Sequence, residues 1–155
     1  MLLENEIVYL RALEPEDLEL LYKWENDSNL WQYGSTLSPY SKMIIRQYIN
    51  DSLSSDIFQA KQLRLMVVLK ENDTTIGTID LYELDIHHSR AGIGILIDKG
   101  FRQKGYSKQA LSLIIKYAFE FLNLNQIFAH VAQNNTLSKN LFENMGFETT
   151  CRMKK

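Results

Sequence analysis

The sequence predicts an α/β fold in which a mixed sheet is flanked by helices. Three observations lead to this class: short apolar or alternating runs typical of strands, longer stripes with helical spacing, and no internal repeat or low-complexity linker. The 155 residues are 45% hydrophobic, which is enough to build a sizeable core without disulfides or metals. We therefore expect one domain over residues 1–155.

The first third of the chain predicts a strand and two helices. The strand runs from Glu6 to Ala12, and Pro15 with its acidic neighbours suits the first turn of the helix that follows. The second helix is expected from about Ser41 to Ser52, because its apolar residues recur at spacings of one, three and four. The apolar faces of the two helices are formed by Leu18, Leu21, Tyr22, Ile44, Ile45, Tyr48 and Ile49.

The middle of the chain predicts three strands and a long helix. Leu65 to Leu69 is a continuous apolar run, and turn residues separate it from a second strand over Thr75 to Leu84. A third strand, Ala91 to Ile97, contains glycines that allow a bulge or the close approach of a ligand. An apolar stripe from Ala110 to Leu122 then gives the clearest helix of the sequence.

The last part of the chain predicts a short strand, a short helix and a final strand. The first strand covers Gln126 to Val131 and the helix covers Ser138 to Asn144. Gly146 and Phe147 lead into the final strand, which contains Glu148 to Met153. The predicted order is therefore βααβββαβαβ, a mixed sheet with helices on its faces.

Charge and cysteine content bear on the class of protein. The chain has 17 Lys and Arg against 19 Asp and Glu, a net charge of −2, whereas a nucleic-acid-binding protein normally carries a basic field. Glu4 and Glu6 stand where a secretory signal would be positively charged, and no apolar run approaches the roughly 20 residues that span a bilayer. The single cysteine, Cys151, cannot form an internal disulfide. We expect a cytoplasmic protein that binds neither nucleic acid nor membrane.

The stretch that carries chemistry is the loop Arg102-Gln103-Lys104-Gly105-Tyr106-Ser107, which follows a predicted strand and opens the long helix. The first N–H groups of a helix are unpaired and lie at the positive end of its dipole, so they can bind a phosphate or pyrophosphate. Gly105 would let the backbone approach that anion, and Arg102 and Lys104 add positive charge. By itself, such a loop is also typical of an ordinary solvated helix start.

Two motifs in this order resemble the GNAT superfamily of acetyl-CoA-dependent N-acetyltransferases. The loop fits that family's [QR]-x-x-G-x-[GA] element, with a serine at the last position as a mild departure. The downstream element N-x-x-S-x-x-L-[YF]-x-x-x-G-F is matched as well, and the resemblance extends to the branch containing ribosomal-protein N-terminal acetyltransferases and spermidine acetyltransferases. The matching residues are Arg102, Gly105 and Ser107 in the first element and Asn135, Ser138, Leu141, Phe142, Gly146 and Phe147 in the second.

This resemblance implies acetyl-CoA as the cosubstrate, no metal, and a small-molecule amine or a protein N-terminus as the acceptor. It also implies a mostly antiparallel central sheet that splays between Gly92 to Ile97 and Gln126 to Val131, with the pantetheine arm in the gap. Backbone N–H groups near Ile95 to Ile97 would stabilise the thioester oxygen. The implied cofactor-binding residues are Ile95, Leu96, Ile97, Arg102, Gln103, Lys104, Gly105, Tyr106, Ser107, Asn135 and Ser138.

The family mechanism is direct attack of a neutral amine on the thioester in a ternary complex. An ammonium with a pKa of about 10 must lose a proton first. Candidate bases are Asp80, Glu83, Asp85 and His87, or a water chain, although a solvated turn charge explains each of these residues as well.

Residues in the early part of the chain are candidates for binding the acceptor. Glu25 and Asp27 could bind a cationic substrate. Trp24, Trp31 and Tyr33 could form the wall of its pocket through cation–π contacts, and aromatic core packing explains them equally well.

The sequence departs from the family at two places. Many relatives have tyrosine in place of Phe142, and that hydroxyl is the usual candidate for protonating the departing thiolate. Here water, Ser138 or another group would supply the proton, or CoA would leave as a thiolate, since a thiol has a pKa of about 8.5. The chain also stops at Lys155, where relatives add a last strand, and an open sheet edge would allow a homodimer. The alternative function is a weakly active or inactive acyl-CoA-binding sensor.

Overall fold

The sheet contains five strands in the order β1-β2-β3-β4-β5 over the residues that the structure, a computed structural model, describes: 2–27, 39–54 and 56–150. Neighbouring strands pair antiparallel from β1 to β4, and β5 pairs parallel with β4. The strands are β1 (Val8–Ala12), β2 (Gln62–Leu69), β3 (Thr75–Asp85), β4 (Arg90–Ile97) and β5 (Gln126–Phe128).

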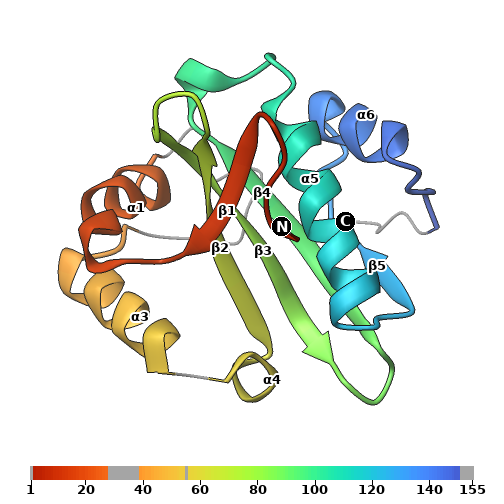
Figure 1. The fold of residues 1–155 in the computed structure, drawn as a ribbon, viewed down its shortest axis with the longest axis horizontal. Helices are drawn as coiled ribbons and strands as arrows, with labels where there is room; N and C mark the ends of the chain where they lie inside the picture. The colour runs from red at the N-terminus through yellow and green to blue at the C-terminus, as the bar shows by residue number, and fades with distance from the viewer. Residues whose placement is uncertain (1, 28–38, 55, 151–155) are drawn as a thin grey trace.

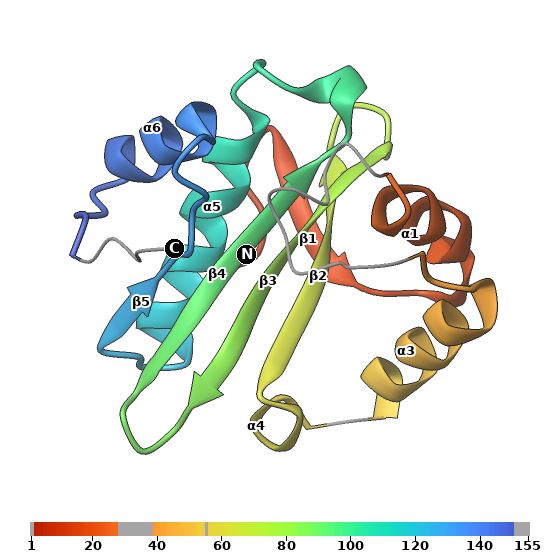
Figure 2. The ribbon, with the colours of Figure 1, turned by 180° about the vertical axis from the view of Figure 1, so that it is seen from behind.

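Helices cover both faces of this sheet (Figures 1 and 2). Figure 1 shows α1 (Leu18–Glu25) and α3 (Lys42–Ser54) on one side and α5 (Tyr106–Lys116) and α6 (Thr136–Asn144) on the other. A short helix, α4 (Ile57–Ala60), leads into β2, and a π-helical turn over Tyr117–Phe121 extends α5.

The alternation of side chains along β2 explains why there are two cores. Leu65, Val67 and Leu69 lie in the larger core with α5, whereas Met66 and Val68 lie in the smaller core with α1 and α3. Successive residues of a strand point to opposite faces, so a continuous apolar run supplies both layers.

The predicted fold class is confirmed, with differences at the ends of elements. β5 ends at Phe128 instead of Val131, α4 was not predicted, and residues 147–150 form no strand. The rest of the predicted last strand, residues 151–153, lies outside the described residues.

The feature that matters most for function is the short pairing of β4 with β5. These strands pair only at Arg90 with Gln126, Ala91 with Ile127 and Gly92 with Phe128. β4 continues to Ile97, so the edge of β4 from Ile93 onward is not paired with β5. This confirms the predicted splay of the two strands, and it leaves backbone N–H and C=O groups of β4 available to a ligand.

Candidate active site

The loop after β4 is shaped by local hydrogen bonds. The carboxylate of Asp98 accepts the N–H of Gly100 at 3.0 Å, and Nε of Arg102 donates to the carbonyl of Ile97 at 2.7 Å. Gln103 and Gly105 both have left-handed backbones, with φ of 59° and 83°. Arg102 therefore fastens the loop to the end of β4, and Gly105 makes the turn that starts α5.

The start of α5 has the properties of an anion site. Gly105 is its N-cap residue, and among the described residues no side chain caps this end. The first amides of the helix therefore lack intrahelical acceptors and lie at the positive end of the dipole. Gln103, Lys104 and Gly105 are exposed, and Tyr106 and Ser107 are half-buried. This arrangement can bind an anion, and the predicted contact of these amides with the pyrophosphate of CoA stays a prediction.

Asp98 ties the loop to the opposite helical layer. Its carboxylate accepts Nε1 of Trp24 at 2.9 Å and lies 3.2 Å from Nζ of Lys23. The bond from Trp24 and the N–H of Gly100 lower the pKa of Asp98 to about 2. Trp24 is 4% exposed, so the structure places this ring in the core as a support for the loop.

Asp80 lies where β4 leaves β5. It pairs with Gly94 across β3 and β4, two residues beyond the last β4–β5 pair. A side-chain carbon at Gly94 would lie 3.0 Å from Oδ1 of Asp80, so the glycine makes room for this carboxylate. Gly94 is three residues from Ile97, about 10 Å along the strand from the loop.

The charges around Asp80 come from neighbouring elements. Arg64 pairs with Asp80 across β2 and β3, and its Nη1 donates to Oε1 of Glu25, on α1, at 2.9 Å. Burial raises the pKa of Asp80, Arg64 opposes this rise and Glu25 adds to it. The result is a carboxylate with increased affinity for a proton.

Aromatic rings continue this site toward β5. The ring of Tyr82 stacks on His130, with centroids 6.1 Å apart, and meets Phe128 edge-on at 5.9 Å. Gly92 permits this position, because a side-chain carbon there would lie 2.3 Å from the Tyr82 ring. Tyr82 lies two residues after Asp80 on β3, so this ring cluster extends from the start of the splay.

The other sequence-predicted bases lie nearer the β3–β4 turn. Glu83 is exposed and has a φ of 49° in the irregular part of β3. Asp85 binds Nδ1 of His88 at 2.8 Å, and His87 is exposed. The structure therefore does not bring these side chains together with Asp80.

The downstream motif forms α6. Oδ1 of Asn135 accepts the N–H of Ser138 at 3.2 Å and caps the helix. The Phe142 ring is 7% exposed and packs edge-on against Phe147, with centroids 5.1 Å apart. Asn135 and Phe142 therefore both stabilise the structure around α6. Their predicted contacts with the pantetheine arm stay predictions.

Some predicted acceptor residues have other positions or none that is described. Glu25 is the partner of Arg64, and the backbone N–H of Asp27 donates to the carbonyl of Trp24 at 3.3 Å. Trp31 and Tyr33 lie outside the described residues.

Several candidate residues escaped the sequence analysis. Arg64, Tyr82, Asp98 and His130 are single polar or aromatic residues in or near strands, with no motif around them. Only the pairing of strands and the packing of helices brings them to the site.

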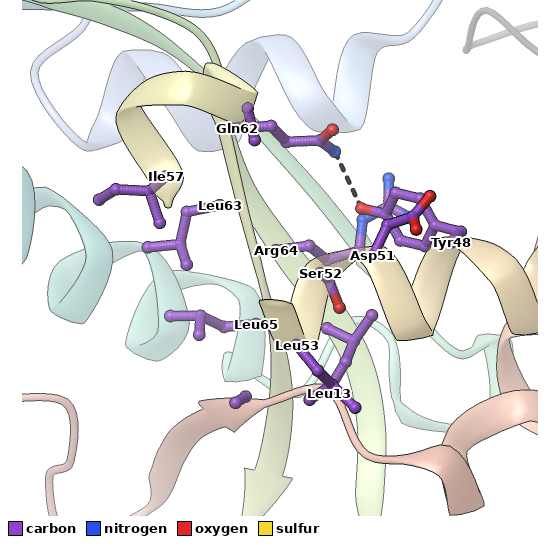
Figure 3. A pocket seen from close by; sticks show the side chains of 12 residues that line it. Leu13, Tyr48, Asp51, Ser52, Leu53, Ile57, Gln62, Leu63, Arg64 and Leu65 are labelled. Carbon is purple, nitrogen blue, oxygen red and sulfur yellow. Dashed lines mark hydrogen bonds between the residues drawn. The ribbon is translucent and has the colours of Figure 1, made fainter. Parts of the chain in front are cut away.

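A separate pocket lies at the start of β2, between α3 and α4, and is lined by residues from both faces of that strand (Figure 3). It has a volume of about 220 Å³ and is lined by Tyr48, Gln62, Arg64 and apolar residues such as Leu53 and Leu63. Nε2 of Gln62 donates to the hydroxyl of Tyr48 at 3.0 Å. Arg64 therefore borders this pocket and also faces Asp80.

Two further findings concern the described part of the chain. It contains no cluster of three or more His, Cys, Asp or Glu side chains that could hold a metal ion. Within the same residues, no helix has the length and apolar character needed to cross a membrane.

The fold and the site together define an acyl-CoA-dependent N-acyltransferase, because a sheet that opens beside the uncapped start of a helix can hold both ends of a CoA thioester. Residues 8–148 match the family described as Acetyltransferase (GNAT) domain. The chain belongs to this family of acetyltransferases, and it transfers an acetyl group from acetyl-CoA to an amine. The predictions of family, cosubstrate and reaction are confirmed.

Similar proteins include enzymes with named acceptors. The spermidine N(1)-acetyltransferase of Vibrio cholerae is 28% identical over 148 residues, which cover 92% of this chain and 80% of that protein. A putative ribosomal N-acetyltransferase of Bacillus subtilis is 32% identical over 158 residues, with 92% and 79% covered. The crystal structure of the Vibrio cholerae enzyme with CoA and spermine has a TM-score of 0.81 and 28% identity, covering 92% of this chain and 81% of that one.

The start of α5 can be tested with a pair of glycine variants. Gly105 and Gly146 have φ of 83° and 95°, and a side-chain carbon at either position meets no atom within 4 Å. Valine should therefore strain both turns similarly, but only Gly105→Val should obstruct the anion. We expect Gly105→Val to weaken CoA binding by about tenfold or more in a calorimetric titration, the equivalent of one hydrogen bond to a charged group. Equal CoA affinities of the two folded variants would contradict this assignment.

Proposed function

We propose that the acceptor is an aliphatic polyamine of the spermidine type and that Asp80 removes the proton from its reacting nitrogen. The observation that carries this proposal is the position of Asp80, half-buried beside Gly94 where β4 leaves β5. A cationic amine is favoured by the carboxylate of Asp80 and by the aromatic ring of Tyr82, two residues further along β3. The similar enzymes of Vibrio cholerae and Escherichia coli that are named spermidine N(1)-acetyltransferases support the same acceptor.

Three parts of the chain would divide the work of the reaction. The amides of Gln103 to Ser107 hold the pyrophosphate, and backbone N–H groups on the open edge of β4, from Ile95 to Ile97, face the thioester oxygen. Asp80 accepts the proton that the ammonium must lose before its nitrogen can attack. Because burial raises the pKa of Asp80, this carboxylate is a stronger base than an exposed one.

Phe142 does not protonate the departing thiolate. Phe142 has no ionisable proton, and its ring is packed against Phe147. An ordinary thiol has a pKa of about 8.5, so the thiolate of CoA is a fair leaving group. After it departs, it can take a proton from water or from Ser138.

Residues 1–155 form one acetyltransferase domain in this proposal, supported by a single sheet and by a family match over residues 8–148. A structure of the Vibrio cholerae relative is described as dodecameric, which supports an association between copies of this chain. A cytoplasmic location stays a prediction.

The acceptor can be tested by measuring CoA release from acetyl-CoA with a panel of amines. Spermidine and spermine should give kcat/KM at least about tenfold above that of peptides with free N-termini, since one further charge-assisted contact is worth that factor. Raised ionic strength should increase KM for the polyamine, because it screens the attraction between the charged amine and the carboxylate of the site as the amine approaches. A preference for peptide N-termini, or for neutral aromatic amines, would contradict the proposed acceptor.

The role of Asp80 can be tested with Asp80→Asn and with Glu83→Gln, which alters the exposed carboxylate of the same strand. Asp80→Asn should lower kcat about 10²- to 10⁴-fold and remove the fall in activity on the acidic side of the pH profile. Glu83→Gln should leave both close to those of the unchanged enzyme. Full activity of Asp80→Asn would exclude Asp80 as the base.

Asp80→Asn should be more stable than the unchanged protein, although its activity should be lower. The pKa of Asp80 is raised from 3.8 by burial, so its ionised form destabilises the fold once the pH rises above that value. Asp80→Asn should therefore melt at a higher temperature than the unchanged protein at neutral pH, and the difference should disappear as the pH falls toward 4. A carboxylate kept only for structure would give a lower melting temperature instead.

A further inference from the structure

Arg64 is a largely buried cation that the reaction does not use directly. It lies on β2, where it pairs with Asp80 of β3, and Nη1 is 2.9 Å from Oε1 of Glu25 on α1. Its guanidinium lies over the ring of Tyr48 on α3, 5.3 Å from the centroid. Nε is buried and has no hydrogen-bond partner among the residues that the structure describes. The guanidinium therefore lies between two helices and the sheet. Its unpaired Nε reduces the stability of the fold.

We propose that Arg64 is a positioning residue that keeps Asp80 ionised in its buried place and so sets the lowest pH at which the enzyme acetylates amines. This inference rests on the proposed role of Asp80 as the base. Arg64 touches neither the amine nor the thioester in this account. It acts only through the charge that it places opposite Asp80.

The groups that face Asp80 define the direction of this effect. The side chains are Arg64 from β2, Glu25 from α1, Tyr48 from α3 and Tyr82 from β3. At neutral pH, Arg64 is the one cation in this set and Glu25 is the other carboxylate. Burial and Glu25 raise the pKa of Asp80, whereas Arg64 lowers it. Without Arg64, Asp80 would hold a proton at a pH where the enzyme now has a free base.

The surroundings of Arg64 show why its position is fixed. Glu25 takes one end of the guanidinium, and Tyr48 packs on its face. The hydroxyl of Tyr48 is in turn held by Gln62, two residues before Arg64 on β2 (Figure 3). Contacts from α1 and α3 therefore fix the position of the Arg64 guanidinium, and with it the positive charge opposite Asp80.

The test is the pH dependence of kcat/KM in variants that remove either the positive charge of Arg64 or the negative charge of Glu25. Arg64→Gln should move the acidic limb of this profile, which is the fall in activity toward low pH, upward by about 1 pH unit, because it removes the positive charge opposite Asp80 on the neighbouring strand. Glu25→Gln should move the same limb downward, because it removes a neighbouring carboxylate. Arg64→Lys keeps the positive charge and should hold the limb near its original position. Lys42→Gln, which removes an exposed cation paired with Glu19, is the control and should not shift it.

The outcomes separate this inference from the proposal on which it depends. If Asp80→Asn keeps an unchanged acidic limb, Asp80 is not the base and the proposed function fails. If Asp80→Asn removes the limb but Arg64→Gln and Glu25→Gln leave it in place, Arg64 has only a structural part and the inference is overturned. Should Arg64→Gln not fold, as judged by circular dichroism and CoA binding, Glu25→Gln and Arg64→Lys decide. An unmoved limb in Glu25→Gln, or an upward shift in Arg64→Lys as large as the usual effect of charge removal, then overturns the inference.

Discussion

The separation of β5 from β4 after three paired residues is the constraint on which the site depends. Two adjacent parallel strands would normally satisfy each other's backbone groups along their whole length. Here β4 extends five residues beyond its last pair, from Ile93 to Ile97, and ends at the loop that starts α5. One open strand edge therefore links an anion site at the start of a helix to a carboxylate at the start of the splay. An extended cosubstrate with a charged end and a reactive end fits this arrangement.

The reaction requires charge in a place that the fold would otherwise keep apolar. Thr78, Asp80 and Tyr82 share one face of β3 with the small core of α1 and α3, and Asp80 faces Arg64 there. A buried carboxylate reduces stability when ionised, and that same burial makes it a better base. Arg64 moderates this cost without removing it, whereas Glu25 adds to it. The site thus trades stability for reactivity, as active sites often do.

The parts of the site that depend on local structure could be predicted from the sequence. Gly105 and the basic loop could be assigned because a helix start and a left-handed turn have local signals, and the second motif located α6. Arg64, Tyr82 and His130 gave no such signal, because their meeting depends on strand register and on the short β4–β5 pairing. Trp24 shows the opposite problem: an aromatic residue that suits a pocket wall lies in the core, where its indole holds Asp98.

The most direct test of this account is a crystal structure of the protein with CoA and spermidine. We expect pyrophosphate oxygens within about 3 Å of the amides of Gln103 to Ser107, the usual length of such hydrogen bonds. The CoA sulfur should lie beside the open edge of β4 near Gly94, with a spermidine nitrogen between it and Asp80. A sulfur atom placed away from the β4–β5 splay, or a spermidine bound with both ends remote from Asp80, would contradict the account.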